Sequence, residues 1–192
     1  MEERYEKEDL QQALDVLRRG GIILYPTDTV WGIGCDATNE EAVRRIFKLK
    51  QREDSKSMLC LLEAAGKLQG YVEEVPEMAW SLIEFATKPL TIIYPGACNV
   101  APSLLAEDGS LGIRITSEKF TQALCAGLHH PLVSTSANIS GQPAARNFGE
   151  MSEEIIGGVD YVVRYRQTDR SEPKPSSIIK LGVHNEIKII RE

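Results

Sequence analysis

Short apolar runs alternate with amphipathic helical segments along the first two thirds of this chain. Residues 8–19 place leucines and an alanine on one helical face, and Gly20-Gly21 ends that helix. Residues 22–25 then form an apolar run that stops at Pro26, which is typical of a buried strand. A chain with this order has to pack helices against strands, so the pattern predicts an α/β fold.

The second predicted helix has the clearest signals. Asn39 is a favourable N-cap residue, and the four positions that follow at helical spacing are all apolar: Ala42, Val43, Ile46 and Phe47. Such a stripe predicts a helix that buries one face against a sheet.

The remaining chain adds two helices and a series of strands. Helices are expected near residues 77–87 and 117–127, and strands at residues 58–62, 90–94, 111–115, 132–135, 161–165, 177–181 and 186–190. Strands and helices alternate early, and strands cluster late. We therefore expect a single α/β domain spanning residues 1–192, with a twisted, mixed β-sheet flanked by helices.

Charge and cysteine content limit the classes of function. The net charge is −6, which argues against broad electrostatic binding of nucleic acid but leaves room for a local basic pocket. The cysteines and histidines lie far from any metal-ligand spacing, so we expect no protein metal site: Cys35, Cys60, Cys98, Cys125, His129, His130 and His184.

The chain also lacks the usual signals for membranes and export. No stretch approaches the ~20 apolar residues that a membrane helix needs, and the first residues, MEERYEKEDLQQ, are too charged for a secretory signal. We therefore expect a cytoplasmic protein without a membrane segment.

Two segments combine hydroxyl side chains with glycines after apolar runs. They are residues 25–37, YPTDTVWGIGCDA, and residues 134–141, STSANISG. Loops of this kind offer hydroxyl groups and close backbone approach, and ligands of open α/β sheets bind beyond the carboxyl ends of strands. The alternative is a pair of turns rich in capping residues, and the residue types alone leave both interpretations open.

A basic segment, residues 48–56, lies at the end of the second helix. The helix dipole favours cations there, so a solvated helix end is the ordinary explanation. The alternative is a phosphate clamp, because the planar fork of arginine and the mobile charge of lysine together neutralise a polyphosphate. The chain has no Walker A or G-x-G-x-x-G sequence, so such a clamp would differ from the common ones.

Together these segments resemble the YrdC-like family of threonylcarbamoyl-adenylate synthases. The resemblance covers essentially the whole chain and is carried by residues 25–37, 46–52, 111–115, 132–141 and 175–181. The family's fingerprint is a K-x-R triplet followed far downstream by S-x-N. Here these triplets are Lys50-Gln51-Arg52 and Ser136-Ala137-Asn138. The resemblance implies a single-domain fold of the YrdC/RibB-like type.

The resemblance also implies a reaction. L-Threonine, bicarbonate and ATP would give threonylcarbamoyl-AMP and pyrophosphate, with Mg²⁺ held by phosphate and water oxygens rather than by a protein cage. A downstream tRNA threonylcarbamoyl transferase would then modify adenosine 37 of tRNAs that read codons beginning with A. Such a reaction needs positioning and charge neutralisation more than a nucleophilic side chain.

Roles for individual residues follow from the same resemblance. The catalytic residues would be Lys50 and Arg52. The ATP-binding residues would be Arg52, Lys56, Ser110, Ser136, Asn138 and Arg191. The threonine-binding residues would be Thr29, Arg114, Ser134 and Ser176. Arg114 also stands out by itself, because a cation inside the apolar strand 111–115 usually has a partner.

Two departures from the family pattern bear on alternatives. Glu53 replaces the usual proline after the K-x-R arginine, and residues 86–91, ATKPLT, replace the common W-P-G-P-L-T. One rival is a YciO-like paralogue of uncertain activity, against which the retained S-x-N triplet argues. A second rival is a double-stranded RNA-binding or tRNA-contacting protein that uses Lys50, Arg52, Lys56 and Arg146, against which the negative net charge argues.

Overall fold

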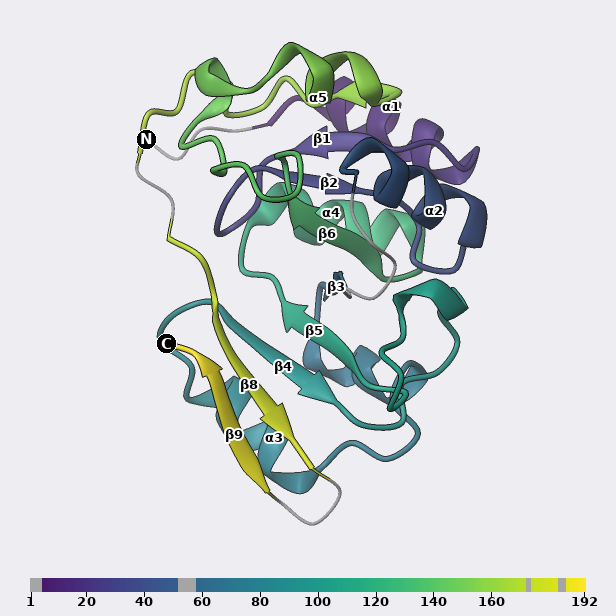
Figure 1. Ribbon diagram of the computed structural model, residues 1–192, viewed down its shortest axis with the longest axis vertical. Helices are drawn as coiled ribbons and strands as arrows, with labels where there is room; N and C mark the ends of the chain where they lie inside the picture. The colour runs from purple at the N-terminus through teal and green to yellow at the C-terminus, as the bar shows by residue number, and fades with distance from the viewer. Residues whose placement is uncertain (1–4, 52–57, 172–173, 183–185) are drawn as a thin grey trace.

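The computed structural model describes residues 5–51, 58–171, 174–182 and 186–192 (Figure 1). The predicted phosphate ligands Arg52 and Lys56, and Glu53 beside them, lie outside the described residues. Within the described ranges no helix is both long and apolar enough to cross a membrane.

One mixed sheet organises the described chain, in the strand order β7-β1-β2-β6-β3-β5-β4-β8-β9. The strands are β1 (Ile23–Tyr25), β2 (Gly32–Gly34), β3 (Leu59–Leu62), β4 (Leu90–Tyr94), β5 (Leu111–Ile115), β6 (Leu132–Ser136), β7 (Tyr161–Val162), β8 (Ser177–Leu181) and β9 (Ile187–Arg191). Three pairs are parallel, namely β1 with β7, β3 with β5, and β4 with β8, while the other pairs are antiparallel. The predicted α/β fold with a mixed sheet is confirmed.

The helices occupy both faces of this sheet. They are α1 (Lys7–Arg18), α2 (Glu40–Leu49), α3 (Glu77–Glu84), α4 (Lys119–Leu128) and α5 (Glu153–Gly158), with 3-10 turns at Ala65–Gly70, Pro102–Leu104 and Phe148–Glu150. Figure 1 shows α1, α2, α4 and α5 around the end with β1, β2 and β6, and α3 at the end with β8 and β9.

Successive side chains of β1 point to opposite faces of the sheet and belong to two different apolar clusters. Ile23 and Tyr25 belong to the apolar cluster formed with α1 and α4, whereas Leu24 belongs to the cluster formed with α2, α3 and α5. The tyrosine hydroxyl donates to the Val133 carbonyl at 3.0 Å, and burial raises the pKa of Tyr25 far above its ordinary value. The sheet is therefore covered on both faces at this end.

The strongest sequence signals match the observed elements. Asn39 caps α2 by accepting from the Ala42 backbone N–H at 3.0 Å, and the whole predicted stripe is buried. Residues 25–37, expected to be a loop, contain the short strand β2, which forms because β1 and β6 hydrogen-bond to it on both sides. Helix α3 ends at Glu84 with Phe85 as its C-cap, earlier than predicted.

Strand β7 is also shorter than predicted, and a buried carboxylate explains why. Asp9 of α1 is 1% exposed and accepts the backbone N–H groups of Arg164 and Tyr165 at 3.0 and 2.9 Å. It also accepts the Tyr161 hydroxyl at 2.6 Å. The N–H groups that would continue the strand are bound to this side chain instead, which fixes α1 to the sheet edge.

We expect Asp9→Asn to lower the free energy of unfolding by about 1–3 kcal/mol, because the amide replaces one acceptor oxygen with an NH₂ donor that faces another donor. Asp15→Asn on the same helix is the matched control, since its side chain is 54% exposed. Urea unfolding measures both. Equal stability of the two variants would contradict the role given to Asp9.

Candidate functional site

A cavity of about 670 Å³ lies on one face of the sheet. Helices α1 and α4 pack on the same face, at the opposite end of the sheet. Its floor is formed by alternate residues of two central strands, Thr91 and Ile93 on β4 and Gly112 and Arg114 on β5. Around this floor lie Thr29, Val30, Met58, Leu59, Ala106, Ser110, Leu111, Ser134, Thr135, Ser136, Ala144, Pro175, Ser176, Ile178, Lys180, Lys188, Ile190 and Arg191.

Arg114 is the buried cation of this floor, with 3% of its side chain exposed. Its Nη2 lies 3.0 Å from the Asp28 carboxylate and donates to the Thr29 hydroxyl at 3.2 Å. Its Nε is buried and has no hydrogen-bond partner among the described residues. A buried donor without a partner is costly, so this group is suited to bind a ligand acceptor.

The loop between β1 and β2 is shaped to present Thr29. Thr27 donates its hydroxyl to the Val30 carbonyl at 2.7 Å and accepts the Thr29 backbone N–H at 3.0 Å. The two threonine hydroxyls are 3.0 Å apart. This local hydrogen bonding holds the Thr29 hydroxyl beside Arg114 at the cavity wall.

The C-terminal strands supply the opposite wall. Ser176 is 2% exposed, and its hydroxyl lies 2.8 Å from that of Thr91 on β4. Arg191 of β9 donates through Nε to the Ser176 carbonyl at 2.9 Å and through Nη2 to its hydroxyl at 3.4 Å. The guanidinium group is thereby fixed at the cavity edge.

Three charged groups at or beside this wall were not predicted from the sequence. Lys180 and Lys188 are directly opposite on β8 and β9 and both line the cavity. Asp108 pairs with Lys180 and accepts the Ser110 hydroxyl at 2.5 Å. The Lys180 ammonium and then the Ser110 hydroxyl lower the pKa of Asp108 to about 2, so this carboxylate is ionised in neutral solution. Alternation along β8 and β9 was the signal that could have revealed the two lysines.

Lys50, predicted to be catalytic, lies outside the described lining of the cavity. The side chain is 1% exposed, and its ammonium group donates to the carbonyls of Ser136 and of Asn138, the latter at 2.6 Å. The Lys50 carbonyl in turn accepts the Ser140 N–H at 2.9 Å. Because a buried charge needs partners, Lys50 is a positioning residue that ties the end of α2 to the loop after β6.

Asn138 also supports this loop from within. Its Nδ2 donates to the carbonyls of Ile139 at 3.0 Å and Gln142 at 2.7 Å. Its Oδ1 is buried and has no hydrogen-bond partner in the described structure. Ser134 and Ser136, on strand β6 just before this loop, line the cavity.

Seven of the predicted site residues therefore line one cavity: Thr29, Ser110, Arg114, Ser134, Ser136, Ser176 and Arg191. Lys50 and Asn138 lie behind it, and Arg52 and Lys56 are outside the described residues. Among the residues described, no three Asp, Glu, His or Cys side chains gather as a metal site. Serine and threonine hydroxyls with fixed cations form a site suited to a ligand that carries carboxylate or phosphate groups.

The fold and this cavity define an α/β protein with a polar, cation-lined cavity on one face of a mixed sheet. The family model Sua5/YciO/YrdC, described as "Telomere recombination", matches residues 15–192, and the chain belongs to this family. Proteins named threonylcarbamoyl-AMP synthase are among its relatives. The one from Vibrio cholerae is 33% identical over 169 residues, which cover 86% of this chain and 90% of the relative. The one from Stenotrophomonas maltophilia is 33% identical over 170 residues, covering 86% and 91%.

Solved structures show the same fold. Sua5 of P. abyssi, complexed with L-threonine, has a TM-score of 0.82 and 27% identity over 93% of this chain and 52% of that one. This chain thus spans about half the length of Sua5. YciO of E. coli has a TM-score of 0.86 and 25% identity, with 99% and 91% covered.

We expect Lys50→Met to lower the free energy of unfolding by about 1–3 kcal/mol, since two carbonyls lose their donor while the apolar stem is kept. Lys48→Met is the control, because Lys48 is exposed on the same helix, and its effect should stay below about 0.5 kcal/mol. Denaturant unfolding measures both. A Lys50→Met protein as stable as the wild type would show that the loop does not depend on the ammonium group.

Proposed function

We propose that this protein is an L-threonylcarbamoyladenylate synthase, which makes threonylcarbamoyl-AMP and pyrophosphate from L-threonine, bicarbonate and ATP. The observation that carries the proposal is Arg114, a buried guanidinium group with an unused donor, facing a cavity rich in hydroxyl groups. Membership of a family that includes proteins named threonylcarbamoyl-AMP synthase supports the same reaction.

The threonine would bind at the Arg114 end of the cavity. A guanidinium group offers paired donors that match a carboxylate, and the pairing of Arg114 with Asp28 leaves Nε for this purpose. The hydroxyl groups of Thr29, Ser134 and Ser176 lie along the same cavity and can bind the amine or the hydroxyl of the substrate.

ATP would occupy the rest of the cavity. Ser110, Ser136 and Arg191 are the predicted ligands that line it, and Lys180 and Lys188 add positive charge to the same wall. Arg52 and Lys56 remain predicted phosphate ligands. No carboxylate belongs to the described lining, so Mg²⁺ would arrive with ATP and keep phosphate and water oxygens as its ligands.

The reaction would proceed in two steps. The threonine amine and bicarbonate first form a carbamate with loss of water. A carbamate oxygen then attacks the α-phosphorus of ATP, and the bond to the bridging oxygen breaks as pyrophosphate leaves. The protein would hold the two substrates in line and neutralise the charge of the departing pyrophosphate, which requires no nucleophilic side chain.

The proposed product would pass to a tRNA threonylcarbamoyl transferase in the cytoplasm. Direct binding of double-stranded RNA or tRNA through the predicted basic surface receives little support. Lys50 is buried and cannot contact RNA, and the exposed Arg146 has the Glu150 carboxylate 2.7 Å from its guanidinium group.

The direct test is pyrophosphate release from ATP in the presence of Mg²⁺ and bicarbonate, with and without L-threonine. We expect release that depends on threonine, together with threonylcarbamoyl-AMP identified by mass spectrometry. Pyrophosphate release that does not depend on threonine, or no release at all, would contradict the proposal and favour the YciO-like alternative.

Arg114→Ala should raise the KM for threonine by at least about tenfold, because a charge-assisted pair contributes about 1.5–3 kcal/mol. The KM for ATP should change much less. Steady-state kinetics with each substrate varied in turn gives both values, and Lys188→Ala serves as a comparison on the opposite wall. Equal effects of Arg114→Ala on both substrates would show that threonine does not bind at Arg114.

A further inference from the structure

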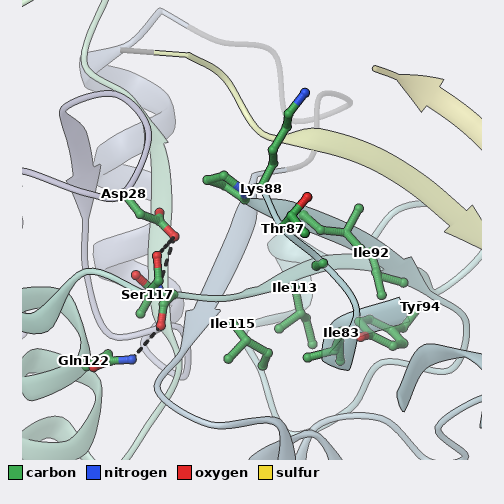
Figure 2. Close-up of a pocket in the computed structure, with 14 residues that line it drawn as sticks. Asp28, Ile83, Thr87, Lys88, Ile92, Tyr94, Ile113, Ile115, Ser117 and Gln122 are labelled. Carbon is green, nitrogen blue, oxygen red and sulfur yellow. Dashed lines mark hydrogen bonds between the residues drawn. The ribbon is translucent and has the colours of Figure 1, made fainter. Parts of the chain in front are cut away.

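A second cavity, of about 330 Å³, lies on the opposite face of the sheet (Figure 2). Alternation along β4 and β5 separates the two cavities: Ile92, Ile113 and Ile115 line the second one, while their neighbours Thr91 and Arg114 line the first. Its volume falls at the lower end of the ~300–1,000 Å³ range of small-molecule sites. The cavity also includes Asp28, Ile83, Ala86, Thr87, Lys88, Pro89, Leu90, Tyr94, Thr116, Ser117 and Gln122.

The second cavity has an apolar part and a polar end. In Figure 2 the side chains of Ile83, Ile92, Ile113, Ile115 and Tyr94 gather on one side. Asp28, Ser117 and Gln122 lie together on the other side, and Lys88 extends away from the apolar group. A ligand that matches this division has an apolar body and one polar head group.

The polar end carries a carboxylate, that of Asp28, while Lys88 lines another part of the same cavity. Ser117 already donates its backbone N–H and its hydroxyl to Asp28 Oδ2, at 3.2 and 3.4 Å. Gln122 donates one amide hydrogen to the Thr116 carbonyl at 2.9 Å, and its amide oxygen is a further acceptor at this end. The Asp28 side chain is 6% exposed and is a carboxylate with lone pairs to spare. Acceptors of this kind, one of them charged, select a cationic donor.

The same carboxylate reaches the first cavity. Asp28 Oδ1 lies 3.0 Å from Arg114 Nη2, so one ion pair has its anion at the second cavity and its cation at the first. A cation placed beside Asp28 would partly neutralise the negative charge that Arg114 experiences from this carboxylate. It would also add its own positive charge, and both effects favour an anion at Arg114.

We propose that the second cavity binds a small apolar molecule with a protonated amine, and that this binding strengthens the binding of a carboxylate at Arg114. The amine site is inferred from the second cavity alone, whereas the coupling also rests on the proposed binding of threonine at Arg114. By linkage, threonine strengthens amine binding by the same factor.

The amine site is tested by calorimetric titration of the wild-type protein with isoamylamine, isoamyl alcohol and isovalerate, which share one apolar skeleton. Isoamylamine should bind about tenfold more tightly than the alcohol, as expected for a charge-assisted contact. Isovalerate should bind least in this cavity. Equal binding of amine and alcohol overturns the proposal, whereas isovalerate can also bind at Arg114 in the first cavity and serves only as a comparison.

Two filling variants locate the binding. Ala86→Trp and Thr87→Trp change exposed residues at the cavity rim, and neither residue lines the first cavity. Each should weaken amine binding at least about tenfold while leaving basal pyrophosphate release unchanged. Circular dichroism confirms that the variants are folded, and undiminished amine binding in both folded variants overturns the location.

The coupling is tested by the dissociation constant of threonine with and without saturating isoamylamine. We expect threonine to bind about fivefold more tightly with the amine and unchanged with isoamyl alcohol. Asp28→Asn should abolish the difference. If the amine binds but the dissociation constant of threonine does not change, the coupling is wrong. If the amine binds and threonine does not bind at all, the proposed substrate is wrong, but the amine site is still supported.

Discussion

The contact on which the candidate site depends is that between the Lys50 ammonium group and the carbonyls of Ser136 and Asn138. It joins the end of α2 to the loop after β6, segments that are far apart in the sequence. The ammonium group is compact enough to lie between two carbonyls in a buried place, where a guanidinium fork would need more room. Lys50 of the K-x-R triplet is therefore joined directly to the S-x-N triplet, and Ser136, whose carbonyl accepts from Lys50, lines the cavity.

The charge of the cavity contrasts with that of the whole protein. The chain carries a net charge of −6, yet Arg114, Lys180, Lys188 and Arg191 all line the cavity. Asp28 and Asp108 pair with two of these cations from the side, which fixes their positions without placing a carboxylate in the cavity lining. A local basic site in an acidic protein attracts a small anion while the remaining surface repels large polyanions.

The sequence predicted what local patterns determine. The apolar stripe of α2 and its Asn39 cap identified that helix, and apolar runs identified most strands. Strand β2 escaped prediction because Gly32 and Gly34 have low strand propensity, and pairing with β1 and β6 creates the strand. The cavity residues were grouped through a family resemblance. The burial of Lys50 and the pairing of Asp108 with Lys180 depend on contacts between distant segments, which spacing along the chain does not reveal.

The strand order has a consequence for the biosynthesis of this protein. The cavity needs Thr29 from the first loop and Arg191 from the last strand, and β8 joins the sheet only by parallel pairing with β4. While a ribosome is still making β8 and β9, the emerging chain holds most of the sheet but lacks one wall of the cavity. Pairings of such long sequence separation also form slowly. A chain that still lacks β8 and β9 therefore lacks the wall that Ser176, Lys180, Lys188 and Arg191 supply, and a ligand that needs this wall can stabilise the fold only after these strands have paired.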